Sequence, residues 1–134
     1  MRGWFVAGAA LAALAIGVRG AGADEPGPGG LRPIAPRTGA EVYQVYCQVC
    51  HMAGGEGAAG AGAFPALARN ARLATSAYPI YMIARGKGAM PSFEELSDEQ
   101  LAELVSYLRT HFGNAYPEPV TAAEVHALRE SLKP

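Results

Sequence analysis

Cysteine, aromatic residues and net charge are all scarce in this sequence of 134 residues. Its 2 cysteines cannot form the disulfide framework of a small secreted domain, since such frameworks need several pairs. The 11 basic and 12 acidic side chains give a formal charge of −1, whereas proteins that bind nucleic acid usually have an excess of positive charge. We therefore expect no nucleic-acid partner, and the length allows one domain at most.

Aromatic residues make up only 8% of the chain, whereas glycine and proline are frequent, with 17 and 10 residues. A core built from these side chains alone would be thin for the length of the chain. The composition therefore indicates that another group contributes to the interior.

The N-terminal segment, residues 1–23, has the form of a secretory signal peptide. A basic residue precedes an apolar run, residues 4–18, and small residues follow up to Ala23. An uncleaved membrane anchor is the competing interpretation, but the run is shorter than the roughly 18 to 20 residues of a spanning helix. We expect cleavage near Ala23 and Asp24, export to the periplasm, and no integral membrane span in the mature chain.

The mature chain begins with a Pro/Gly-rich leader, residues 24–37, and then changes to a helical period. N-cap signals start three helices at Thr38 with Glu41, Ser97 with Gln100, and Thr121 with Glu124. The second helix carries an apolar stripe of Leu101, Leu104, Val105, Leu108 and Phe112, and it is expected to end at Gly113-Asn114. Shorter helical pieces are expected at residues 66–75 and 79–85, and a flexible glycine-rich loop at 53–63. No convincing strand pair is present, so the predicted fold class is all-α.

One pentapeptide contains both cysteines. Cys47-Gln48-Val49-Cys50-His51 has the form C-x-x-C-H, the attachment sequence of c-type haem. Two thiols three positions apart on a helical turn can each add to one vinyl group of the porphyrin, and His51 then directs its imidazole at the iron from the same side. We therefore predict one covalent haem c attached through Cys47 and Cys50, with His51 as an iron ligand.

Two other kinds of site use a C-x-x-C pair. A thioredoxin-like redox pair expects a preceding strand within a βαβ pattern, whereas here a helix precedes the pair and a glycine-rich loop follows. A zinc site needs further ligands, but no third cysteine exists, and His111 and His126 lie far away in the sequence. Both alternatives are therefore weaker than haem attachment.

The second axial position of the iron needs another ligand. The candidates are Met52, Met82, Met90, His111 and His126. Met52 is too close to His51 to reach the opposite face of the haem, and Met82 lies in a predicted helix where core packing is its expected role. Met90 lies in an irregular loop between glycine and proline, which favours it as the thioether ligand.

The chain from Thr38 to Phe112 resembles the class I cytochromes c, which are small monohaem electron carriers. The resemblance rests on the C-x-x-C-H motif and on Gly39, Tyr43 and Cys47 at four-residue intervals. Further matches are Phe64-Pro65-Ala66-Leu67, the G-x-M-P-x-F segment from Gly88 to Phe93, and Leu104 with Tyr107.

This resemblance implies three to five helices around one covalently attached haem, with the first and last core helices crossing near Gly39. It implies axial ligation by His51 and Met90, and a Pro65 carbonyl that accepts a hydrogen bond from the other ring nitrogen of His51. One position departs from the family, because Met52 stands where many members have glycine or another small residue.

The predicted organisation is a cytochrome c domain at residues 38–112 followed by a C-terminal extension with a short helix at 113–134. The extension looks like the tails of cytochromes that accompany periplasmic dehydrogenases, and it either packs on the core or docks a partner. The chain has lysine only at positions 87 and 133, so it lacks the lysine ring of mitochondrial cytochromes c. Arg85 and Lys87 form either a small positive patch or plain solvated charges.

Two protein ligands leave no open coordination site on the iron, and methionine opposite histidine raises the reduction potential. We therefore predict an electron-transfer protein and not an enzyme. Its expected partners are a periplasmic dehydrogenase as donor and an oxidase or other cytochrome as acceptor, with the chain as free carrier or cytochrome subunit. The alternative is a haem enzyme or a gas-binding, gas-sensing cytochrome in which Met90 is labile.

Overall fold

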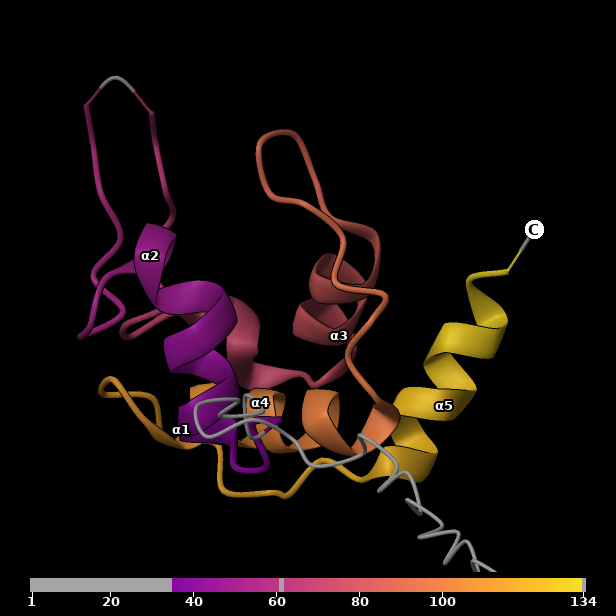
Figure 1. Ribbon diagram of the computed structural model, residues 1–134. Helices are drawn as coiled ribbons and strands as arrows, with labels where there is room; N and C mark the ends of the chain where they lie inside the picture. Colours follow the sequence, from indigo (N-terminus) through magenta and orange to yellow (C-terminus); the bar gives the residue numbers. More distant parts are fainter. Residues whose placement is uncertain (1–34, 61, 134) are drawn as a thin grey trace, which may run out of the picture. The chain divides into compact units, whose positions relative to one another are not determined.

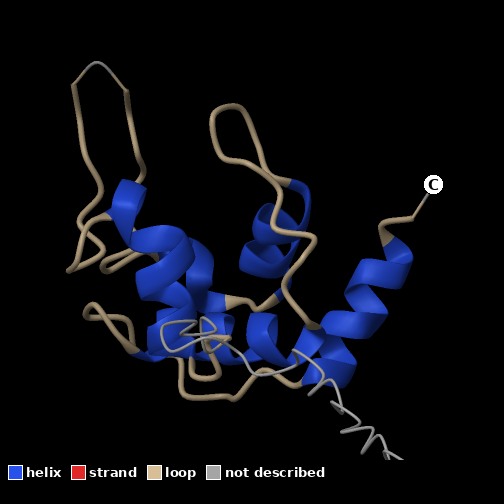
Figure 2. Cartoon of the chain, viewed as in Figure 1, coloured by secondary structure: helices blue, strands red, loops and turns tan. Residues whose placement is uncertain are grey.

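The structure, a computed structural model, describes residues 35–60 and 62–133. The predicted signal peptide and most of the leader lie outside the described residues. The helical elements in chain order are α1 (Gly39–Val42), η1 (Tyr43–Cys47), α2 (Gln48–His51), η2 (Ala71–Ala74), α3 (Ala77–Arg85), α4 (Asp98–Thr110) and α5 (Ala122–Ser131) (Figure 1). Within the described residues the helices are joined by loops and no strand is formed (Figure 2), which confirms the all-α prediction. No helix in this part of the chain is long and apolar enough to cross a membrane.

The first three elements form one continuous helix from Gly39 to His51, since the residues at their junctions keep right-handed helical angles. A capping box starts it as predicted: the Glu41 amide donates to the Thr38 hydroxyl at 3.2 Å, and the Thr38 amide donates to the Glu41 carboxylate at 3.0 Å. Its middle section, η1, is a π-helix, a widened turn that is frequent at functional sites.

Helix α4 provides more buried hydrophobic residues than any other described element. Ser97 and Gln100 form the predicted capping box, and the stripe from Leu101 to Leu108 is buried. The predicted end of this helix was wrong, because α4 stops at Thr110 and Phe112 has a left-handed backbone with φ of 58°. The reversal lets the Phe112 carbonyl accept a hydrogen bond from the Arg69 amide at 3.1 Å, so a tertiary contact overrides the helical period.

Helix α1 crosses α4 at Gly39, as the resemblance implied (Figure 1). A Cβ atom at this position would lie 2.2 Å from the Glu103 carbonyl oxygen and 2.5 Å from the Tyr107 Cβ. Neither neighbour is the end of a flexible side chain, so only glycine permits this approach.

The segment before α3 differs from the prediction. Residues 66–70 are not helical, and only η2, a 3₁₀ turn, forms within the expected helix at 66–75. Two asparagines take backbone oxygens that a helix would use: Asn70 donates to the Ala66 carbonyl at 2.8 Å, and Asn114 donates to the Leu67 carbonyl at 2.9 Å. Helix α3 then begins at Ala77, two residues before the predicted start.

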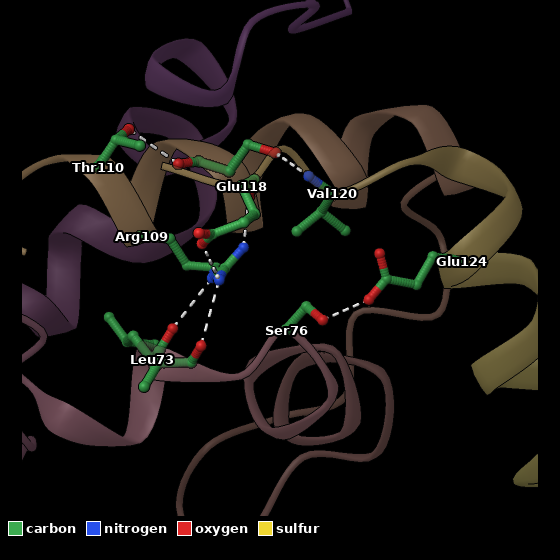
Figure 3. A network of polar contacts seen from close by, with 9 residues as sticks. Leu73, Ser76, Arg109, Thr110, Glu118, Val120 and Glu124 are labelled. Atoms are coloured by element: carbon green, nitrogen blue, oxygen red, sulfur yellow. Dashed lines mark hydrogen bonds and ion pairs between the residues drawn. The ribbon is translucent and has the colours of Figure 1, made fainter. Parts of the chain in front are cut away.

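Helix α5 packs on the core through contacts with α4 and α3. Val125 is fully buried, Arg129 forms an ion pair with Asp98 at 2.9 Å, and the Ser76 hydroxyl donates to the Glu124 carboxylate (Figure 3). Of the two roles considered for the extension, packing on the core is the one that these contacts show.

A buried arginine joins three segments next to this helix. Arg109 is only 5% exposed, and its guanidinium donates to the carbonyls of Leu73 at 3.0 Å and Ala74 at 3.2 Å (Figure 3). The same group donates to the Glu118 carbonyl and pairs with the Glu118 carboxylate at 3.4 Å. Because these acceptors satisfy the charge, the arginine is tolerated in the interior.

Replacement of Gly39 by alanine tests the helix crossing. The new Cβ would force α1 away from α4, and we expect the free energy of unfolding to fall by about 2 kcal/mol or more, as in other overpacked cores. Chemical denaturation followed by circular dichroism measures the change. Gly62→Ala is the control, because its Cβ would meet only Phe64 ring atoms at an ordinary 3.5 Å. Equal stability of the two variants would show that the crossing tolerates a side chain.

Candidate functional site

The two cysteines and the histidine of the motif lie on one helical turn. Cys47 ends η1, and Cys50 and His51 belong to α2. Cys47, Cys50 and His51 are each half-buried. The helix therefore presents two thiols and an imidazole together.

The Cys47 thiol does not have the acidity of a redox cysteine. Burial raises the pKa of the Cys47 thiol to about 12, and repulsion from a charged Cys50 contributes less. Thioredoxin-like cysteines react as thiolates and need a pKa close to or below neutrality. The environment of Cys47 therefore argues against the thioredoxin-like alternative.

The zinc alternative has no support in this part of the molecule. Among the residues that the structure describes, no three histidine, cysteine or acidic side chains come close enough together to hold a metal ion. A structural zinc ion needs four such ligands. The C-x-x-C pair is thus not half of a zinc site built from these residues.

The imidazole of His51 is oriented by the loop that follows it. Its Nδ1 atom lies 2.9 Å from the Pro65 carbonyl oxygen. A carbonyl only accepts hydrogen bonds, so Nδ1 carries a proton, and in the neutral imidazole Nε2 is then the nitrogen with a lone pair. This arrangement fixes the ring and makes Nε2 the nitrogen available to a metal.

The glycine-rich loop is held more firmly than its composition predicts. The Gly57 amide donates to the His51 carbonyl at 3.1 Å, and Ala58 and Phe64 exchange two backbone hydrogen bonds of 3.0 and 2.8 Å. A Cβ at Gly57 would lie 2.2 Å from the Phe64 carbonyl oxygen, so glycine is needed where the two sides of the loop meet. The loop thereby brings Pro65 to His51.

Met90 lies on the loop after α3, which in Figure 1 extends on the same side of α4 as the loop after α2. Two hydrogen bonds with Lys87, of 2.9 and 3.1 Å, close a tight turn, and Gly88 within it has φ of 61°. Met90 is half-buried and packs against the core, but no hydrogen bond of the described residues links it to the His51 segment. The turn holds Met90 in a defined position.

The two other histidines considered as axial ligands have partners elsewhere. The His111 ring stacks on Tyr107 with centroids 4.0 Å apart, and the His126 ring lies 3.1 Å from the Asp98 carboxylate. Met82 is half-buried within the regular helix α3, whereas Met90 lies on an irregular loop. Met90 stays the predicted ligand because of this loop position.

Half-buried apolar side chains lie on the motif helix, after the glycine-rich loop and around Met90. They are Tyr46, Cys47, Leu67, Met90 and Phe93. Tyr46 before the motif and Phe93 after Met90 meet edge to face, with ring centroids 6.0 Å apart. Incompletely buried apolar surface beside two thiols and an oriented imidazole fits a large, flat, apolar porphyrin, as the thin core had indicated.

Comparison with known proteins assigns the family. Residues 34–108, more than half of the chain, match the family described as "Cytochrome C oxidase, cbb3-type, subunit III". A cytochrome c-552 of Thermus thermophilus is 33% identical over 122 residues, which cover 75% of this chain and 80% of that protein. The chain belongs to the class I monohaem cytochromes c. Its cofactor is therefore a covalent haem c.

Longer proteins also match this cytochrome c. The cytochrome c subunit of alcohol dehydrogenase (quinone) from Gluconacetobacter polyoxogenes is 36% identical over 110 residues, and that from Gluconobacter oxydans (strain 621H) is 34% identical over the same length. The match covers 72% of this chain but only 23% of either subunit. The chain thus spans about a quarter of the length of these relatives.

The backbone at Met52 is a feature that spacing alone does not predict. This residue of the cytochrome has φ of 65° and ψ of 167°, a combination adopted almost only by glycine. The Tyr43 hydroxyl donates a hydrogen bond of 2.6 Å to the Met52 carbonyl. Burial raises the pKa of Tyr43 to about 12, so at neutral pH the hydroxyl is protonated and can donate. The sequence contained one signal for this strain, because Met52 stands where many family members have glycine or another small residue.

Substitutions at Met52 test the strain. Met52→Gly removes the Cβ that makes the conformation costly, and we expect the free energy of unfolding to rise by ~1 kcal/mol. Met52→Ala keeps the Cβ and loses side-chain contacts, so its stability should equal that of the wild type or fall. Guanidinium denaturation of both haem-loaded variants checks this order. Strain at this residue is refuted if Met52→Gly is no more stable than Met52→Ala.

Proposed function

We propose that this chain is an exported one-electron carrier whose haem is attached through Cys47 and Cys50 and ligated by His51 and Met90. The observation that carries the proposal is the motif turn in which the Pro65 carbonyl orients His51 and leaves Nε2 free for the iron. When bound, the haem supplies a one-electron couple between ferric and ferrous iron. One electron accepted from a donor is then balanced by one delivered to an acceptor.

The protein's own groups act on this couple through ligation and burial. The hydrogen bond from His51 to Pro65 sets the orientation and basicity of the imidazole. Met90 would hold the iron through its thioether sulfur, and a methionine ligand together with histidine raises the reduction potential of a haem. With His51 and Met90 both holding the iron, no position would remain for oxygen or peroxide, and this would favour a carrier over a haem enzyme or gas sensor.

The organisation of the chain supports export. We propose that residues 1–23 are a signal peptide removed in the periplasm and that residues 24–37 are a leader. Residues 38–112 then form the cytochrome c domain, and residues 113–134 form the extension that contains α5. Covalent attachment suits an exported carrier, because its cofactor is not lost by dissociation.

We further propose a dehydrogenase as electron donor and an oxidase or another cytochrome as acceptor. The names of the alcohol dehydrogenase subunits support the donor, since their cytochrome parts match most of this chain. The shared part is only 23% of those subunits, so the chain corresponds to one haem domain and not to the remainder of them.

Substitution of Met90 tests the axial ligand. Met90→Ala should abolish the methionine–iron charge-transfer band of the oxidised protein and allow carbon monoxide to bind the reduced protein at neutral pH. Met82→Ala is the matched control and should keep the band. Carbon monoxide binding by the wild type without denaturant would contradict stable Met90 ligation and favour the gas-binding alternative.

Export and partnership are tested together on the protein from its native cells. We expect mass spectrometry of the periplasmic form to give the mass of a chain that begins at Asp24 and carries one covalent haem. The haem stays attached because the two thiols each form a thioether. We also expect a dehydrogenase to co-purify with it or to reduce it rapidly in a stopped-flow assay. A mass that includes residues 1–23 would contradict cleavage, and failure of every periplasmic dehydrogenase fraction to reduce it would contradict the donor.

A further inference from the structure

A buried tyrosine connects the core to the residue that follows His51. Tyr43 is 2% exposed, and its ring packs against Phe112 at a centroid distance of 4.9 Å and against Tyr107 at 6.0 Å. Its hydroxyl reaches nine positions along the chain to the Met52 carbonyl. The ring is fixed by the core, so the hydroxyl is a fixed donor.

The Met52 peptide is where such a donor matters. Its backbone angles are unfavourable for any residue with a Cβ, so the conformation persists only if surrounding contacts hold it. The Met52 amide donates to the Gln48 carbonyl at 2.8 Å, and the Met52 carbonyl accepts from the Gly55 amide at a longer 3.2 Å. The contact with Tyr43, at 2.6 Å, is the shortest of the three and comes from outside the local turn.

His51 lies between this peptide and the glycine-rich loop. Its carbonyl accepts from Gly57 at 3.1 Å, and its ring donates to Pro65 at 2.9 Å. The backbone angles of Met52 set the direction in which the chain leaves α2. The contacts of His51 with Gly57 and Pro65 depend on this direction. A change in that direction would therefore alter the hydrogen bond between His51 and Pro65.

We propose that Tyr43 is a positioning residue for the His51 ligand: its hydroxyl holds the strained Met52 peptide and so preserves the hydrogen bond from His51 Nδ1 to the Pro65 carbonyl. The inference rests on the proposed ligation of iron by His51. A strong Nδ1 hydrogen bond makes the imidazole a better electron donor, which favours ferric iron. Loss of the Tyr43 hydroxyl therefore weakens this bond and raises the reduction potential.

Tyr43→Phe tests this role in the haem-loaded protein. The variant keeps the ring in the core and removes only the donor. We expect the ratio of reduced to oxidised protein at a fixed ambient potential to rise at least threefold, equivalent to about 28 mV for a one-electron couple. Tyr107→Phe is the matched control, because the Tyr107 hydroxyl makes no hydrogen bond within the described residues, and it should leave the ratio unchanged. An unchanged ratio in Tyr43→Phe, or an equal rise in both variants, overturns the proposal.

Variants at Met52 separate positioning from general loosening of the fold. With Met52→Gly the backbone angles at residue 52 are accessible without the hydrogen bond from Tyr43. Adding Tyr43→Phe in this background should therefore change the logarithm of the reduced-to-oxidised ratio by less than half of the change seen in the wild-type background. With Met52→Ala the Cβ remains, and the full effect should persist. An equal effect in the glycine and alanine backgrounds would show that Tyr43 does not act through the Met52 backbone.

Hydrogen exchange gives a readout that does not depend on the iron. In Tyr43→Phe the Gly57 amide should exchange at least tenfold faster, because the His51 carbonyl that accepts its hydrogen bond shifts. Unchanged exchange overturns the proposed link. A wild type that shows no low-spin haem spectrum would instead reject the ligation in the proposed function, so the two failures are distinguishable.

Discussion

The contact between α1 and α4 at Gly39 is the constraint on which the other positions depend. With no side chain between the two backbones, the rotation of the first helix is fixed relative to the core. Tyr43 then points into the aromatic cluster around Phe112, and the motif lies one to two turns further along the same helix. The place where haem is attached is therefore defined by a close packing contact about two turns away.

The features that the sequence predicted well are those encoded by neighbouring residues. Capping boxes at Thr38 and Ser97 depend on side chains three positions apart, and both formed as expected. The attachment motif is equally local, since five consecutive residues contain both thiols and the imidazole. Gly39 was recognised through the family pattern, and the close approach of α4 explains why glycine is required there.

The features that could not be predicted depend on residues far apart in the chain. Asn114 satisfies the backbone of residues 66–70 from 47 positions away, so the expected helix does not form there. Phe112 continues the apolar period of α4 but leaves the helix, and its carbonyl accepts a hydrogen bond from the Arg69 backbone amide. The glycine content predicted a flexible loop. Its hydrogen bonds to the His51 and Phe64 segments are made by the backbone, and composition does not reveal such bonds.

Arg109 connects the segment after α4 to the segment before α3, which affects how the protein must be made. Its guanidinium takes acceptors from Leu73 and Ala74 on one side and from Glu118 on the other. A chain truncated after α4 would keep this arginine and lose the Glu118 carbonyl and carboxylate that its guanidinium contacts. The interior is therefore complete only once the segment that contains Glu118 has been synthesised, and a minimal cytochrome cut from this chain needs that segment.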